Sequence, residues 1–113
     1  RSTFHYEWQG VKVSERYEVV GDALAGAGKL VRTLKLDGQI PTGAMFRVAS
    51  AKKITPQGAA FLVEGDHFEV PGENKFLVSA DDAKLDRDNL TLPARAEIVV
   101  TYSWPNAHAM HTH

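Results

Sequence analysis

The stretch ARAEIVVTYSW, residues 94–104, decides the fold class of this chain. Every even-numbered residue in this stretch is apolar, whereas the odd-numbered residues, which form the other parity, are mostly polar. The apolar set is Ala94, Ala96, Ile98, Val100, Tyr102 and Trp104. Successive side chains of a strand point to opposite faces, so this alternation predicts a strand with one buried and one solvated face. A helix would not keep the two parities apart.

Shorter segments with the same alternation precede this strand. Residues 3–8 and 11–20 flank Gln9-Gly10, a pair typical of a two-residue turn, and together predict a β-hairpin. After a loop of Gly and Ala at 21–28, residues 30–36 predict a third strand. Further short strands are expected within residues 44–50, 60–64, 67–70 and 75–79, with turns at Pro56-Gln57-Gly58, Gly65-Asp66 and Pro71-Gly72.

Frequent turn signals between short strands are typical of an all-β domain. We expect an antiparallel β-sandwich of about 7–9 short strands, immunoglobulin-like or jelly-roll-like. Residues 80–89 lack β-branched side chains and are the one stretch compatible with a helical turn. Residues 1–104 are then one domain, and residues 105–113 a His-rich tail, because Pro105 ends the last strand. Since the alternation starts so close to Arg1, we expect the first strand to be truncated.

Length, charge and cysteine content exclude several classes of protein. A chain of 113 residues fits one hydrophobic core. With a formal net charge of -1, it has no excess of positive charge for binding nucleic acid or an anionic bilayer. No apolar run approaches the roughly 20 residues of a spanning helix. The absence of cysteine excludes disulfides, thiolate metal sites, a cysteine nucleophile and a CxxCH haem attachment in this chain.

The sequence shows no catalytic constellation. His5 and His67 fall on expected strands, where a histidine is usually packed or solvated, and no serine lies in a GxSxG pattern. The glycines at 21, 26 and 28 do not form GxGxxG, and no helix is expected after them. We therefore expect a protein that is not an enzyme and that binds no cofactor.

Two segments contain residue types that bind metals. The tail carries three histidines and a methionine, which could bind zinc, copper or a haem iron; they are His108, His111, His113 and Met110. A mobile terminus explains these residues more simply. The acidic run Asp81, Asp82, Asp86, Asp88 and Asn89 could suggest calcium, but it lacks the glycine and terminal glutamate of an EF-hand loop, so a solvated loop is the favoured interpretation.

Aromatic residues are concentrated in the expected strands near the two ends of the chain. They could form a platform on which a sugar stacks, which would make the domain a carbohydrate-binding module. Their parity fits packing in the core and in the hairpin first. The set is Phe4, Tyr6, Trp8, Tyr17, Tyr102 and Trp104.

Several segments together resemble a known module. They are STFHYEWQGV at 2–11, ERYE at 15–18, LVRTL at 30–34, MFRVA at 45–49, KKI at 52–54 and AEIVVTYSW at 96–104. In order and spacing they are similar to the β-rich accessory module of large planctomycete-type c-type cytochrome proteins with dehydrogenase-like propeller domains. The likeness covers residues 3–104.

The resemblance implies a location and a partner. It implies a periplasmic or extracellular setting and a non-catalytic accessory role in an electron-transfer assembly. The expected partner is a haem-bearing or membrane-bound electron-transfer protein that the module packs against, positions or shields. The family's haem attachment motif is missing here, so electron transfer itself does not carry over to this chain.

Overall fold

The structure, a computed structural model, describes residues 2–21, 28–66 and 75–103. All regular secondary structure in these ranges is β-strand. Each strand pairs antiparallel with its neighbours in one sheet that is not closed. The described strands are β1 (Ser2–Trp8), β2 (Val11–Val20), β3 (Lys29–Asp37), β4 (Met45–Gln57), β5 (Ala60–Asp66), β6 (Lys75–Ser79), β7 (Lys84–Asp86), β8 (Asn89–Pro93) and β9 (Glu97–Ser103). The predicted all-β antiparallel fold class is confirmed.

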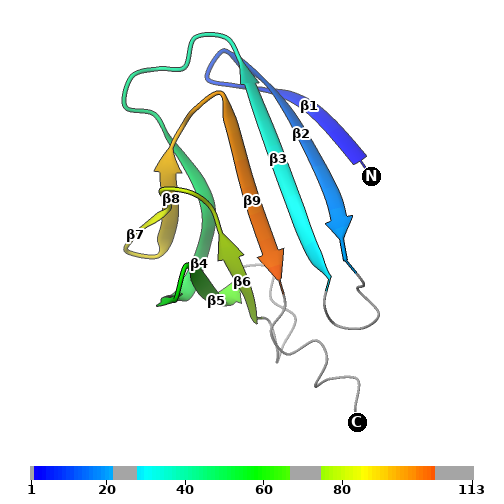
Figure 1. Cartoon of the computed structure of the whole chain (residues 1–113). Coiled ribbons are helices and arrows are strands. Elements are labelled where there is room, and N and C mark those ends of the chain that lie inside the picture. Colours follow the sequence, from blue (N-terminus) through cyan, green and yellow to red (C-terminus); the bar gives the residue numbers. More distant parts are fainter. Residues whose placement is uncertain (1, 22–27, 67–74, 104–113) are drawn as a thin grey trace.

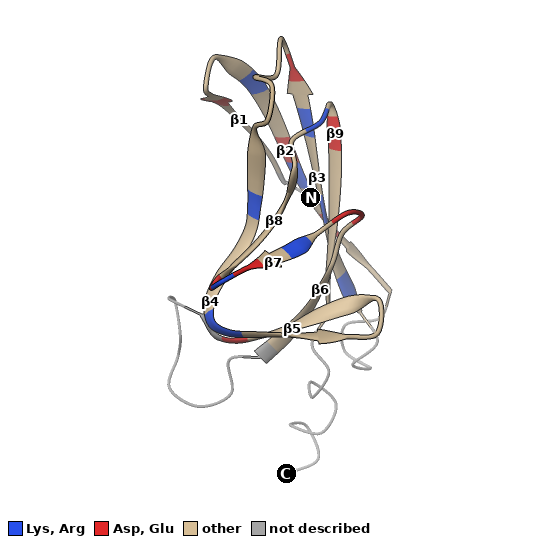
Figure 2. Ribbon diagram, turned by 90° about the vertical axis from the view of Figure 1, so that its left-hand side faces the viewer, with Lys and Arg blue, Asp and Glu red and all other residues tan. Residues whose placement is uncertain are grey.

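One sheet supplies both layers of the sandwich-like fold. The strand order is β1-β2-β3-β9-β6-β5-β4-β8-β7. In Figure 1, β1, β2, β3 and β9 lie side by side, while β4, β8 and β7 lie opposite them. Figure 2 looks between these two layers, with β5 across the lower end. The long strand β4 makes the corner, because its first half pairs with β8 and its second half with β5.

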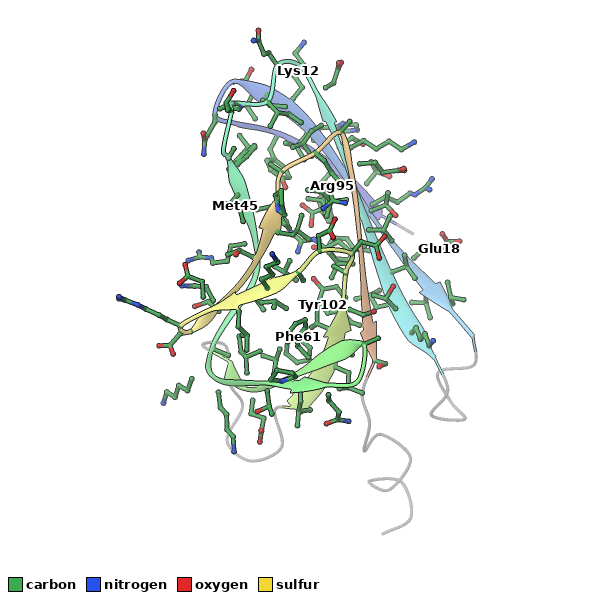
Figure 3. All side chains as sticks on the ribbon, turned by 60° about the vertical axis from the view of Figure 1, so that its left-hand side comes forward. Lys12, Glu18, Met45, Phe61, Arg95 and Tyr102 are labelled. Carbon is green, nitrogen blue, oxygen red and sulfur yellow. The ribbon has the colours of Figure 1, made fainter. Side chains whose placement is uncertain are left out.

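The core lies between the two layers. Strand β9 carries the alternation that the sequence predicts: Ile98 and Val100 are almost fully buried, whereas Val99 is 45% exposed. The remaining buried apolar residues come from β2, β3, β4, β5, β6 and β8, and form one cluster: Val11, Val13, Leu34, Leu36, Val48, Ala51, Val63, Val78, Leu90 and Leu92. In Figure 3, Tyr102 and Phe61 lie toward this core, and the exposed Lys12 and Glu18 project away from it.

The first hairpin forms as predicted, with Trp8 opposite Val11 across a two-residue loop. Both loop residues have positive φ, 52° at Gln9 and 82° at Gly10. A turn of this kind matches the twist of the paired strands, and asparagine followed by glycine fits it best.

Substitutions in this loop are expected to change stability through the backbone alone, because a Cβ atom at Gly10 would meet nothing within 4 Å. Gly10→Ala should lower the free energy of unfolding by about 1–2 kcal/mol, since alanine resists positive φ. Gln9→Asn should raise it by about 0.5 kcal/mol. Urea unfolding measures both. Equal stability of Gly10→Ala and the wild type would contradict this account of the loop.

Four expectations along the chain need correction. The turn expected at Gly65-Asp66 is absent, because both residues belong to β5 and Asp66 pairs with Ala51. Strand β4 does not end before Pro56, which pairs with Phe61, and the turn follows at residues 58–59. The proline is tolerated because β8 pairs with β4 only up to Ser50 and leaves the later edge open. Strand β9 begins at Glu97 rather than at residue 94.

Residues 80–89 contain no helical turn. They form β7 between two turns, with positive φ at Asp82 and Arg87. The expected strand at 67–70, the Pro71-Gly72 turn and the tail at 105–113 lie outside the described residues. Within the described part of the chain, no helix is long and apolar enough to cross a membrane.

Candidate functional site

A charged cluster interrupts the apolar inner face of β2 and β3. Glu15 follows Val11 and Val13 on the inner parity of β2, yet it is only 6% exposed. Arg32 occupies the inner parity of β3, two residues before the buried Leu34. Because Glu15 is paired with Leu34 and Arg32 with Tyr17, the two charges are diagonal neighbours on one face. They form an ion pair through Arg32 Nε and Glu15 Oε2.

Three tyrosines complete the hydrogen bonds of this pair. The hydroxyl of Tyr6 donates to Glu15 Oε1 at 2.8 Å, and that of Tyr17 donates to Glu15 Oε2 at 2.5 Å. Arg32 Nη1 donates to the hydroxyl oxygen of Tyr102 at 3.1 Å. Among the described residues, no buried side-chain polar atom lacks a partner. The cost of burying the charges is therefore offset by a complete set of hydrogen bonds.

Aromatic rings enclose the guanidinium group. It lies 5.8 Å from the centroid of the Tyr17 ring and 5.4 Å from that of Phe46, within the range of cation–π attraction. Phe46 belongs to β4, so this contact ties the two layers together. Phe4 meets Tyr17 edge to face at 6.0 Å, and the Phe76 and Tyr102 rings are also 6.0 Å apart. The cluster is thus fixed by rings from five strands.

The cluster shifts the protonation equilibria of its members. Burial opposes the charge of Glu15, but hydrogen bonds from Tyr17, Arg32 and Tyr6 outweigh it and hold its pKa below the usual value. Burial opposes the charge of Arg32 as well, but Tyr102 and Glu15 raise its pKa, so it stays protonated. A low-pKa carboxylate engaged by three donors is a weak proton acceptor, which disfavours acid–base catalysis here.

Burial, followed by the hydrogen bond to Glu15, raises the pKa of Tyr6 and of Tyr17 to about 12. A raised folded-state pKa contributes stability that is complete below the unfolded value of 10.0 and is lost as the pH rises toward 12. In a Tyr102→Phe variant, which leaves only these two tyrosines, we expect tyrosinate absorbance to develop with midpoints near pH 12. Midpoints near pH 10 would contradict the enclosed geometry.

Beside this cluster the inner face is open. Phe4 is 52% exposed, Tyr6 42% and Val19 64%, although all three share the inner parity of β1 and β2. We call Phe4, Tyr6 and Val19 the open inner face. The second layer lies opposite β3 and β9 and does not reach over this part of the sheet (Figure 1). Exposed apolar side chains that gather on one face can form a binding surface.

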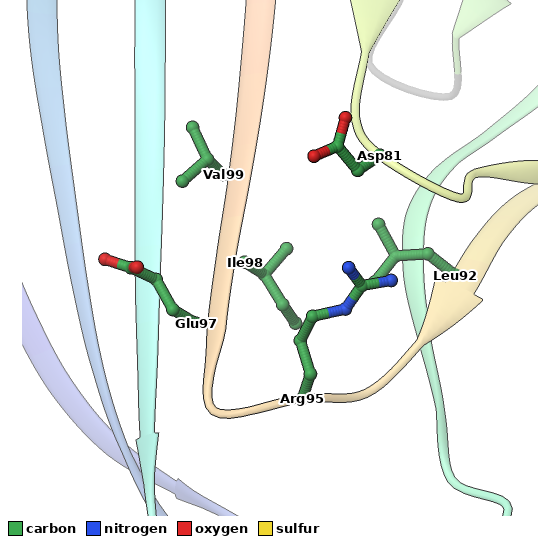
Figure 4. Close-up of a pocket in the computed structure, with 6 residues that line it drawn as sticks. All are labelled: Asp81, Leu92, Arg95, Glu97, Ile98 and Val99. Atoms are coloured by element: carbon green, nitrogen blue, oxygen red, sulfur yellow. The ribbon is translucent and has the colours of Figure 1, made fainter.

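A second polar feature lies where the two layers meet, at the β8–β9 connection. The guanidinium of Arg95 reaches toward the loop before β7 (Figure 4), and its Nη2 atom lies 3.0 Å from Asp82 Oδ2. Asp81 and Leu92 line the same depression. Since both members of this ion pair are well exposed, the pair contributes little to stability.

The structure brings together some of the predicted site residues and leaves others apart. Of the aromatic set, Phe4, Tyr6, Trp8, Tyr17 and Tyr102 all lie on the inner face, where Trp8 and Tyr102 pack against the core. Trp104 and the histidines His108, His111 and His113 lie outside the described residues. The described residues, which include the acidic run, contain no group of three His, Asp or Glu side chains placed to hold a metal ion.

Sequence reasoning missed the Glu15–Arg32 pair. The signal was present, because each is a charged residue on the apolar parity of its strand. His5, considered as a packed or solvated residue, is exposed on the outer face of β1.

No family model, curated protein or solved structure matches the chain.

Proposed function

We propose that this domain is a non-catalytic module that binds a protein partner through its open inner face, as an accessory part of a periplasmic electron-transfer assembly. The observation that carries the proposal is the exposure of Phe4, Tyr6 and Val19 on the inner face of the sheet, next to the paired charges of Glu15 and Arg32. Such a surface offers apolar contact area with little loss of conformational freedom on binding.

Charge and chemistry favour a protein over other ligands. The net charge of -1 provides no general attraction for nucleic acid. The cluster holds its charges in internal pairs, which leaves the open inner face mainly apolar and aromatic. The resemblance to modules of c-type cytochrome proteins supports a haem-bearing protein as the partner, and it supports a periplasmic or extracellular location.

The test is capture of a haem protein by the immobilised domain from a periplasmic extract, with haem staining of the captured bands. Val19→Asp should abolish capture, because a carboxylate would be placed on the open inner face. Val20→Asp is the matched control, since Val20 is the next residue of β2, is 48% exposed and points to the opposite face. Absence of any haem-stained band with the wild type would refute the proposal.

A carbohydrate is the second candidate ligand. The observation in its favour is that the aromatic rings of Phe4 and Tyr6 are both about half exposed on the same face of β1. A sugar ring can stack on exposed aromatic rings of this kind. Calorimetric titration with a panel of oligosaccharides tests it, with Phe4→Ala as the variant expected to lose binding. No heat of binding with any sugar would remove this candidate.

A further inference from the structure

The two edges of the sheet differ in how well they are protected. At one end, β7 has three residues, all exposed, and two of them are the charged Lys84 and Asp86. A short charged edge strand resists pairing with another chain. At the other end, β1 is seven residues long and contains neither lysine nor proline. No described strand pairs with its outer side.

Hairpin geometry fixes which backbone groups of β1 are free. A two-residue loop is closed by a hydrogen-bonded pair, here Trp8 and Val11, and hydrogen-bonded and non-bonded pairs then alternate along the strands. The even-numbered residues of β1 therefore bond to β2. Thr3, His5 and Glu7 direct their N–H and C=O groups to the open edge, where they can pair with another strand.

We propose that a second copy of this chain pairs with β1 in antiparallel fashion, about a two-fold axis at Tyr6. This register places His5 opposite Glu7 of the other copy, twice, as hydrogen-bonded pairs. Phe4 then faces Trp8 of the other copy, and Tyr6 faces its own equivalent, in the closer non-bonded pairs. The backbone pairing of this dimer uses the edge of the sheet, so it is tested separately from the proposed function, although its contacts also involve Phe4 and Tyr6 of the open inner face.

Side-chain complementarity between His5 and Glu7 favours a second copy of the chain as the partner and also selects the register. Centring the axis on His5 would place the two His5 side chains opposite each other and Glu7 opposite Thr3. An axis at Glu7 would place two carboxylates opposite each other, which is repulsive. Only the axis at Tyr6 pairs His5 with Glu7. It also covers the exposed rings of Phe4 and Tyr6, which no described part of the chain covers.

The contact is small, since one strand pair with its flanking aromatic rings falls below the area of a standard stable interface. We therefore expect a dimer with a dissociation constant on the order of 10 μM. The two sheets would continue through β1 into one sheet, with both inner faces on the same side.

Sedimentation equilibrium of the full chain with two charge variants tests the register. The homodimer of His5→Glu would contain two pairs of facing carboxylates, and that of Glu7→Lys would place an ammonium group opposite each His5. Each substitution should raise the dissociation constant about tenfold.

An equal mixture of the two variants should form a heterodimer as tight as the wild-type dimer. In that heterodimer the introduced glutamate faces the introduced lysine, and the remaining contact is the native one between His5 and Glu7. A mixture no tighter than the separate variants would overturn the register.

A backbone variant tests the edge without relying on charge. His5→Pro removes the N–H group that points away from β2, so it should leave the hairpin intact and raise the dissociation constant at least about tenfold. His5→Thr, which keeps the N–H group, is the matched control and should change it by about threefold or less. A wild-type protein that stays monomeric at millimolar concentration, or equal constants for these two variants, would overturn the proposal.

Discussion

Replacing Glu15 with alanine is expected to lower the free energy of unfolding by about 3–5 kcal/mol. The substitution leaves the Arg32 charge without its carboxylate and removes the acceptor of the Tyr6 and Tyr17 hydroxyls. The side chain of Arg32 is 17% exposed, so water can partly solvate its charge. We therefore expect a loss of unfolding free energy near the lower end of the 3–5 kcal/mol range, about 3 kcal/mol. Urea unfolding followed by circular dichroism gives the value.

Two controls separate this effect from a general sensitivity to charge removal. Asp82→Ala breaks the exposed pair with Arg95 and should cost no more than about 1 kcal/mol. The double variant Glu15→Met and Arg32→Met should recover most of the loss, because apolar side chains of similar size can replace a buried ion pair. A loss below about 1 kcal/mol in Glu15→Ala would contradict the importance of the pair.

The same residue accounts for part of the expected acid sensitivity. The folded-state pKa of Glu15 lies below its unfolded value of 4.5, because hydrogen bonds to its carboxylate outweigh burial. Its contribution to stability is therefore complete above pH 4.5 and is lost as the pH falls through the folded-state pKa. The stability of Glu15→Ala should fall less steeply than that of the wild type in this acid range.

Truncation of Leu90 to alanine is expected to be the second large effect, with a loss of about 2–5 kcal/mol. Leu90 lies on β8, is fully buried, and belongs to the cluster that joins the two layers. Leu85→Ala is the matched control, because Leu85 is its cross-strand partner on β7 and is 38% exposed. We expect less than about 1 kcal/mol there. Similar losses at both positions would show that β8 does not pack as described.

Local patterns in the sequence were enough to predict most of the strands. The alternation of Ile98, Val100 and Tyr102 predicts β9, and Gln9-Gly10 predicts the first hairpin, because both signals act between near neighbours. Strands β7 and β8 were missed. The three residues of β7 are all exposed and carry no apolar alternation, and in β8 the alternation is limited to Leu90 and Leu92. The bounds of β7 are set by turns at Asp82 and Arg87, which have positive φ; aspartate adopts this conformation more often than most residues, whereas arginine seldom does.

The candidate site could not be assembled from sequence alone. Glu15 and Arg32 become neighbours only in the register in which β2 pairs with β3, and Tyr102 joins them because β9 pairs with the other side of β3. The open inner face depends on how far the second layer extends over the first. Parity shows that Phe4 and Val19 are on the inner side of the sheet, but not that they lack a cover.

The place of β9 in the sheet has a consequence for synthesis of the chain. Among the described strands, it is the last to leave the ribosome, yet it lies between β3 and β6. Until residues 97–103 emerge, β1 to β3 and β4 to β8 share no strand pairing, and the facing edges of β3 and β6 stay open. Such edges invite wrong pairing between nascent chains. The domain therefore completes its sheet in one late step, when β9 joins β3 to β6. Until β9 has been translated, these strand edges are not protected from aggregation.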